Sequence, residues 1–116
     1  MSAKDTVDTG LCPIVEGAFT LLGKKWSALI IHVLGVETRR FSELLLDLPG
    51  ISPRMLAERL KELELTAIVS RTVIPETPVR IEYALTEKGR HLLPLLTGIA
   101  EWAHDWAERD AVTVDL

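Results

Sequence analysis

"GISPRMLAERLKELE", residues 50–64, predicts a helix with a clear start. Ser52 is a good N-cap, because its hydroxyl can accept a hydrogen bond from an otherwise unpaired amide of the first turn. Pro53 suits the first helical position, where no amide hydrogen is needed. At the helical period the apolar residues share one narrow stripe, made of Leu56, Leu60, Leu63 and Ala67. The charged residues of the opposite face are Arg54, Glu58 and Lys61, and Arg59 lies nearer the edge of the stripe.

A shorter helix is predicted just before this one. Its apolar positions are Phe41, Leu44, Leu45 and Leu48, and Pro49-Gly50 ends it. Two short helices joined by a tight, glycine-containing turn form a helix-turn-helix. In that motif the second helix enters the DNA major groove and its first residues meet base edges, a position held here by Ser52, Pro53, Arg54 and Met55. An ordinary core helix with a solvated outer face is the competing interpretation.

Two segments rich in β-branched residues follow. They are IVSRTVI, residues 68–74, and VRIEYAL, residues 79–85, with a proline-containing spacer between them. They predict a two-stranded hairpin, so the fold class is mainly α (α+β), a winged helix-turn-helix with a hairpin wing. Arg80, beside the loop, is placed to enter a narrow minor groove, and Arg71 to meet phosphate. A cross-strand pair between Arg71 and Glu82 is the alternative.

Helical periodicity predicts further helices over residues 14–22 and 26–34, and a last one from Thr86 to Arg109. Pro94 should kink the last helix or delay its start. The apolar residues of this last helix are Leu92, Leu95, Leu96, Ile99, Trp102, Ala103 and Trp106. Such a stripe is usually core, but a terminal helix of a small domain has little core to cover, which favours a partner chain. Glu101 and His104 have the spacing of some metal ligands, but without a second pair they are interpreted as a surface pair, and no metal is expected.

Length and charge limit the possible functions. The 116 residues are enough for one domain, and no apolar run is long enough to cross a membrane. The net charge of −4 is unevenly distributed: residues 24–90 hold 11 Lys and Arg against 9 Asp and Glu, and the remainder holds 2 against 8. A DNA-binding face needs a local basic patch and not a basic average, so this division permits DNA binding without proving it.

Several motifs together resemble one known family. They are CPI at residues 12–14, GKKWSALI at 23–30, RRFSELL at 39–45, LPGISPRMLAERLKELE at 48–64, VSRTVIPETPVRIEYALTEKGRHLLPLL at 69–96 and IAEWA at 99–103. The motifs cover about residues 12–106. Their order and spacing make the chain similar to the HxlR-type helix-turn-helix transcriptional regulators, which are winged-helix relatives of the MarR group. The resemblance implies a homodimer without catalytic activity, with dimer contacts from the first and last helices. By position it implies DNA contacts at Ser52, Pro53, Arg54, Met55 and Lys61, and at Thr77, Val79 and Arg80 in the wing.

The chain departs from this family pattern in two places. Where such proteins usually carry a glycine at the exit of the recognition helix, this chain reads LTAIV, residues 65–69. Glycine ends a helix in the left-handed conformation at little cost, so its absence here bears on the geometry of the helix exit and on the angle of the wing. Leu46 stands where a polar or basic residue is common, and its spacing points it away from the apolar side of its helix.

Cys12, the single cysteine of the chain, precedes the first residue of the opening helix. One cysteine excludes an internal disulfide and suits a reducing cytoplasm. A thiol at a helix N-terminus feels the positive end of the helix dipole, which makes it more reactive, and some HxlR-type regulators sense oxidants or electrophiles with such a residue. The competing interpretation is an inert cysteine packed at the dimer seam.

These observations lead to one expected organisation and function. Residues 1–11 are expected to be a flexible tail, residues 12–110 the winged domain and residues 111–116 a C-terminal tail. The expected function is a cytoplasmic, sequence-specific regulator that binds double-stranded operator DNA, acts as a repressor, and responds to a small molecule or a thiol-reactive signal, without a cofactor. The expected dimer contacts are Ile14, Leu96, Ile99, Trp102 and Trp106. A winged helix used only for protein contacts is the alternative; an enzyme lacks support, because no nucleophile signature or phosphate-binding loop is present.

Overall fold

The computed structural model describes residues 12–114 of the chain, and its side chains up to residue 111. The helices are α2 (Pro13–Gly23), α3 (Ser27–Leu34), α4 (Phe41–Asp47), α5 (Pro53–Leu65), α6 (Glu87–Arg90) and α7 (Leu93–Val114), and the strands are β1 (Arg39–Arg40), β2 (Val69–Ile74) and β3 (Arg80–Leu85). The expected N-terminal tail, residues 1–11, lies outside the described residues. This mixed α+β arrangement confirms the predicted winged helix-turn-helix.

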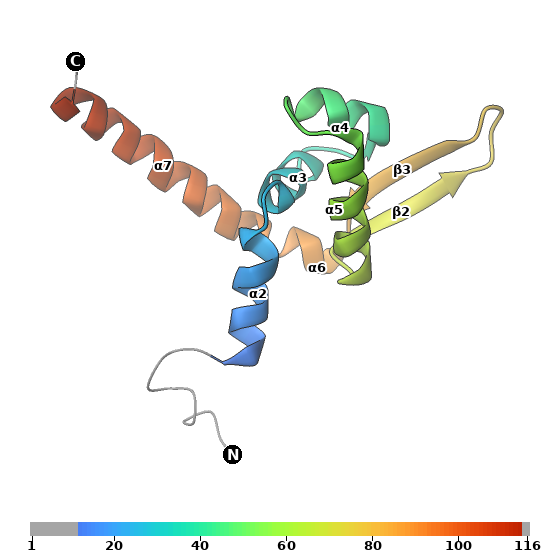
Figure 1. The fold of residues 1–116 in the computed structure, drawn as a ribbon, viewed down its shortest axis with the longest axis horizontal. Helices are drawn as coiled ribbons and strands as arrows, with labels where there is room; N and C mark the ends of the chain where they lie inside the picture. The colour runs from blue at the N-terminus through green and yellow to red at the C-terminus, as the bar shows by residue number, and fades with distance from the viewer. Residues whose placement is uncertain (1–11, 115–116) are drawn as a thin grey trace.

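The molecule is flat, with extents of 54 × 53 × 23 Å. The β2–β3 hairpin and α7 project from opposite sides of a small helical body, and α2 leaves that body in a third direction (Figure 1). The body is held by one hydrophobic core whose most completely buried side chains are Ile30, Ile31, Leu44, Leu56, Leu60 and Leu63. The core therefore joins α3, α4 and α5, while α2, α7 and the wing extend from it.

The helix-turn-helix is formed by α4 and α5. Gly50 in the connecting turn has a φ of +97°, a conformation that residues with a Cβ rarely adopt, and the Ile51 amide donates to the Leu48 carbonyl at 3.1 Å. Ser52 is the N-cap of α5, as predicted: its Oγ accepts from the Met55 amide at 3.0 Å. Pro53 occupies the first helical position, also as predicted.

The sheet contains one strand more than the sequence predicts. Strands β2 and β3 form the expected hairpin, but the two-residue strand β1 pairs antiparallel with the other edge of β3, which gives the order β1-β3-β2. The register places Arg71 opposite Tyr83, and Thr72 opposite Glu82. The alternative pairing of Arg71 with Glu82 is therefore wrong.

Two residues other than glycine adopt a left-handed conformation at helix boundaries. Trp26, with a φ of +82°, precedes α3, so that helix starts at Ser27 and not at Trp26. Ala67, with a φ of +63°, lies beyond the end of α5, so the predicted apolar stripe ends at Leu63. The Ile68 amide donates to the Leu63 carbonyl and the Ala67 amide to the Glu64 carbonyl, both at 2.9 Å. This is the closure that glycine usually provides, made here by alanine.

The predicted C-terminal helix is divided into α6 and α7. Pro94 is the second residue of α7, where its missing amide hydrogen costs nothing, so it delays the start of the helix as predicted and does not kink it. Helix α7 continues to Val114, past the expected domain boundary at residue 110. In the part of the chain that the structure describes, no helix has both the length and the apolar character that a bilayer crossing requires.

We predict that Ala67→Gly stabilises the protein by about 1 kcal/mol, because glycine carries no steric penalty in the left-handed region. The matched control is Ala57→Gly, at an exposed position inside α5, where the same change should destabilise by about 1 kcal/mol. Urea unfolding at one protein concentration measures both changes. A loss of stability in Ala67→Gly would contradict the assigned backbone conformation.

Candidate nucleic-acid interface

The outward face of α5 is set by the leucines on its other side. Leu56, Leu60 and Leu63 are buried in the core, which leaves Arg54 and Lys61 exposed on the opposite face. The Arg54 side chain is 90% exposed. Lys61 lies seven positions after Arg54, which is about 10 Å along the helix axis. The two cations therefore form a line along the accessible side of the second helix of the motif.

The N-terminal end of α5 contains the four residues expected at the base edges. Ser52, Pro53 and Arg54 are exposed there. Met55 is only partly exposed and packs against the hydrophobic core. Arg54 Nε lies 3.7 Å from Glu58 Oε2, an exposed ion pair that water and salt screen strongly. Such a pair leaves the guanidinium available to another partner.

The wing presents a mixed charge. Thr77 and Val79 are exposed in the loop between β2 and β3. Arg80 is held between two carboxylates: its Nη2 lies 3.3 Å from Glu76 Oε2 and its Nε lies 3.2 Å from Glu82 Oε2. A phosphate would have to compete with both glutamates, so the wing is a weaker anion-binding element than Arg80 alone suggests.

Side chains remote in sequence hold α5 in place. Arg59 Nε donates to the Lys25 carbonyl at 2.8 Å, and Lys24 Nζ donates to Glu62 Oε2 at 3.0 Å. Both contacts tie the α2–α3 connection to the inner edge of the helix, which agrees with the predicted position of Arg59 near the apolar stripe. Their partners lie more than 30 residues apart, so no sequence pattern indicates them.

Arg39 and Asp47 form a second support that sequence reasoning missed. Arg39 donates from Nε to Oδ2 at 2.8 Å and from Nη2 to Oδ1 at 3.0 Å, so the pair is bidentate and joins β1 to the end of α4. The hydrogen bond to Asp47 raises the pKa of the Arg39 guanidinium above its ordinary value. Arg39 therefore fixes the first helix of the motif and is not a free cation for DNA.

Cys12 is the N-cap residue of α2, where the sequence placed it. Its Sγ accepts a hydrogen bond from the Val15 amide at 3.4 Å, and the residue is partly exposed. The sulfur therefore lies at the positive end of the helix dipole and within reach of solvent.

The expected dimer residues divide into two groups. Ile14 is 84% exposed and Trp102 is 64% exposed, and Ile99 and Trp106 are exposed as well. Leu96 is only 7% exposed, because it packs into the core of its own chain. The expectation that Leu96 contributes a dimer contact is therefore corrected. Leu46, on the outer face of α4, is exposed as its spacing predicted.

Comparison with known proteins identifies a family and relatives to which this chain is similar. The family model described as HxlR-like helix-turn-helix matches residues 21–111. The chain is 53% identical over 98 residues to the HTH-type transcriptional regulator YvaP of Bacillus subtilis, which covers 84% of this chain and 91% of YvaP. It is 52% identical over 98 residues to the HTH-type transcriptional regulator YodB of the same organism, covering 84% of this chain and 88% of YodB.

Solved structures show the same likeness. The reduced form of YodB matches with a TM-score of 0.76 at 52% identity, over 85% of this chain and 97% of that one. The redox regulator HypR in its oxidised form matches with a TM-score of 0.76 at 37% identity, over 81% of this chain and 96% of that one. YodB is also known in a diamide-treated and a quinone-bound form.

Proposed function

Since this chain belongs to the HxlR-like helix-turn-helix family and is a DNA-binding transcriptional regulator, we propose that it represses transcription as a homodimer bound to a specific operator. In this proposal the protein acts in the cytoplasm, where the DNA lies, and it acts by binding without catalysing a reaction. Residues 12–110 form the unit that binds DNA and dimerises, and the last turn of α7 extends that unit. A dimer bound across a promoter represses by excluding other proteins from the same DNA.

The observation that carries this proposal is the exposed Arg54 at the head of α5. Its side chain is long and 90% exposed, and its contact to Glu58 is a screened surface ion pair. Arginine can bond guanine O6 and N7 together, which makes it a reader of base identity in the major groove. Ser52, Pro53, Met55 and Lys61 accompany it, with Met55 mainly fixing the helix end.

The wing has a different role in the proposal. Arg80, with Thr77 and Val79, meets the sugar–phosphate backbone or the minor groove, where contacts position the protein without reading the sequence directly. Because Glu76 and Glu82 flank Arg80, this contact adds modestly to affinity.

The test of operator binding is retardation and footprinting of the duplex upstream of the gene. A dimer that reads two major grooves should protect two inverted half-sites about one helical turn, or a multiple of it, apart. Binding should weaken steeply with added salt, because phosphate contacts release counterions. A protected region without any inverted repeat would contradict the dimeric arrangement.

We predict that Arg54→Ala and Arg80→Ala have different effects. Loss of Arg54 should cost about 1–3 kcal/mol on the operator and little on random duplex, because a base contact is lost. Loss of Arg80 should weaken both duplexes to a similar extent. Gel retardation at one fixed salt concentration measures all four affinities.

Glu76→Gln is the matched control for the wing. It removes a carboxylate that competes for Arg80, so affinity should rise on both duplexes. If Arg54→Ala keeps the affinity and the preference of the wild type while remaining folded and dimeric, α5 does not read DNA as proposed.

We predict that Trp102→Ala weakens the homodimer by about 2–4 kcal/mol, the range for a buried tryptophan at the centre of an interface. The proposed interface consists of Ile14 on α2 and Ile99, Trp102 and Trp106 on one face of α7. His104→Ala is the control, because His104 lies two positions after Trp102 and therefore on nearly the opposite face of the helix. Sedimentation equilibrium measures both variants, and equal dimerisation in the two would exclude this face as the interface.

We predict that diamide or a quinone releases the wild-type protein from its operator and does not release Cys12→Ser. YodB, which is similar to this chain, is known in a diamide-treated and a quinone-bound form. Serine is a good N-cap, so the substitution keeps the helix start and removes only the thiol. With one cysteine in the chain, a disulfide formed there joins two molecules or a small thiol. Equal release of both proteins in a gel-retardation titration would leave Cys12 as a packing residue.

A further inference from the structure

Glu58 places a carboxylate on the outward face of α5, between the two cations that are proposed to meet DNA. It lies four positions after Arg54 and three before Lys61. At the helical period the three residues fall within about 60° of one another, opposite the buried leucines. The Glu58 side chain is 52% exposed. A carboxylate in this place repels phosphate, so it opposes the contacts that the two cations would make with the DNA backbone.

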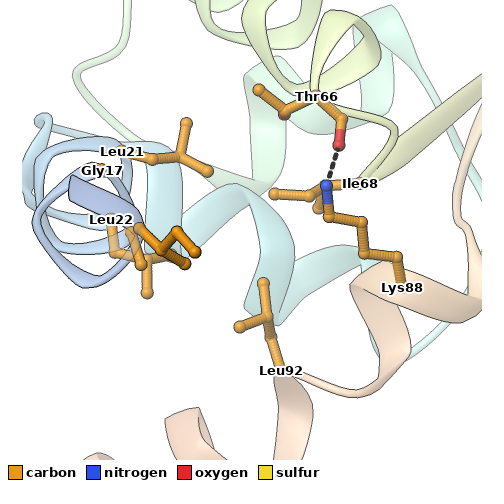
Figure 2. A pocket seen from close by; sticks show the side chains of 9 residues that line it. Gly17, Leu21, Leu22, Thr66, Ile68, Lys88 and Leu92 are labelled. Atoms are coloured by element: carbon orange, nitrogen blue, oxygen red, sulfur yellow. Dashed lines mark hydrogen bonds between the residues drawn. The ribbon is translucent and has the colours of Figure 1, made fainter. Parts of the chain in front are cut away.

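Other charged residues around α5 hold the helix in place. Arg59 Nη1 lies 3.4 Å from Glu62 Oε1 at the inner edge of the helix. At the C-terminal end, Lys88 reaches back from α6, and its Nζ donates to the Thr66 carbonyl at 2.7 Å, as the dashed line in Figure 2 shows. These contacts do not involve Glu58, which faces away from the body of the protein.

The contact between Glu58 and Arg54 leaves both groups able to bind another partner. Glu58 Oε2 lies 3.7 Å from Arg54 Nε, which is longer than an N–H···O hydrogen bond. The two charges attract each other, but neither group uses its hydrogen-bonding capacity on the other. An ionised carboxylate accepts through two oxygens and donates nothing. A group that binds Glu58 must therefore offer a hydrogen-bond donor.

Cytosine is the base that offers such a donor without an acceptor beside it. In the major groove cytosine presents its N4 amino group, whereas adenine presents an amino group next to the N7 acceptor, and guanine and thymine present acceptors. A carboxylate therefore gains a hydrogen bond from cytosine and is repelled by the acceptors of the other bases. Glu58 lies about 6 Å from Arg54 along the helix axis, and base pairs are about 3.4 Å apart. The two residues can therefore reach base pairs that are one or two steps apart.

We propose that Glu58 is a specificity-determining residue of α5, which accepts a hydrogen bond from the N4 amino group of an operator cytosine. This cytosine lies one or two base pairs from the guanine that Arg54 contacts. On DNA without a cytosine at this place the carboxylate finds no donor and repels nearby phosphates. Glu58 therefore lowers the affinity for random sequences, which depends mainly on charge. The proposal rests on the proposed binding of DNA by α5.

Gel retardation of the full chain on the footprinted operator tests this contact, with each base pair replaced in turn by the other three at one fixed salt concentration. The position at which Arg54→Ala loses a guanine preference marks the base pair that Arg54 contacts. One or two base pairs away, the wild type should prefer cytosine about tenfold, the expected effect of a hydrogen bond to a charged group.

Glu58→Gln changes the chemistry of the contact and keeps the size of the side chain. A glutamine amide both donates and accepts, and so matches N7 and N6 of adenine. At the cytosine position the preference should therefore shift to adenine, while the guanine preference due to Arg54 is kept. Affinity for random duplex should rise about twofold to fivefold, because a surface charge that opposes phosphate contacts is removed.

Glu64→Gln is the matched control. It makes the same change of charge on the same helix, but Glu64 lies six positions after Glu58 and about a third of a turn around the axis, away from the outward face. Its base preference should equal that of the wild type at every position. Circular dichroism of each variant confirms that it is folded.

A purely structural role of Glu58 would give a different result. If Glu58→Gln keeps the wild-type preference at every position, or changes it only at the guanine position of Arg54, Glu58 acts through the helix or through Arg54 and the proposal is overturned. The same shift in Glu64→Gln also overturns it, because charge alone then explains the effect. If the wild type does not distinguish the operator from random duplex, or if Arg54→Ala keeps every preference, the proposed function of α5 fails and this proposal fails with it.

Discussion

Burial of the leucine stripe of α5 is the constraint on which the rest of the structure depends. Leu56, Leu60 and Leu63 are almost completely removed from water, and each contributes about 1.5–3 kcal/mol through that burial. Rotating the helix about its axis would expose them, so the stripe also determines which residues face outward. The exposure of Arg54 and Lys61 follows from the packing of the leucines. The contacts from Arg59 and Glu62 to the α2–α3 connection then fix the same orientation from the edge of the helix.

The features that local chemistry determines could be predicted from the sequence. Period and capping located α5 with its N-cap at Ser52, and the glycine turn before it, because these depend only on residues a few positions apart. The hairpin was predictable from two β-branched segments around a proline-containing spacer. The outward face of α5 follows from the same period, so that part of the candidate site was predictable as well.

The features that depend on remote contacts could not be predicted. Strand β1 has only two residues, both arginine, and exists because β3 offers it a free edge. The burial of Leu96 depends on where the first turn of α7 meets the core. The spacing of apolar residues within α7 does not predict that contact. The register of the hairpin places Tyr83 opposite Arg71, and the glutamates around Arg80 follow from that register and the loop. The sequence pattern placed Ala67 in the apolar stripe of α5, because alanine rarely closes a helix in the left-handed conformation. Contacts with residues remote in sequence stabilise that conformation here.

Contacts from Thr86 and Gly89 hold the turn after α5 against α6. The Ile68 carbonyl accepts from the Thr86 amide at 3.0 Å, and the Thr86 hydroxyl donates to the Ala67 carbonyl at 2.6 Å. Gly89 packs so close to this turn that a Cβ there would collide with the Ile68 carbonyl oxygen. Helix α6 is therefore bound directly to the exit of α5 and the start of β2, and a short turn connects it to α7. A displacement at the start of α7 therefore has two routes to α5, one through this turn and one through the core, into which Leu96 packs.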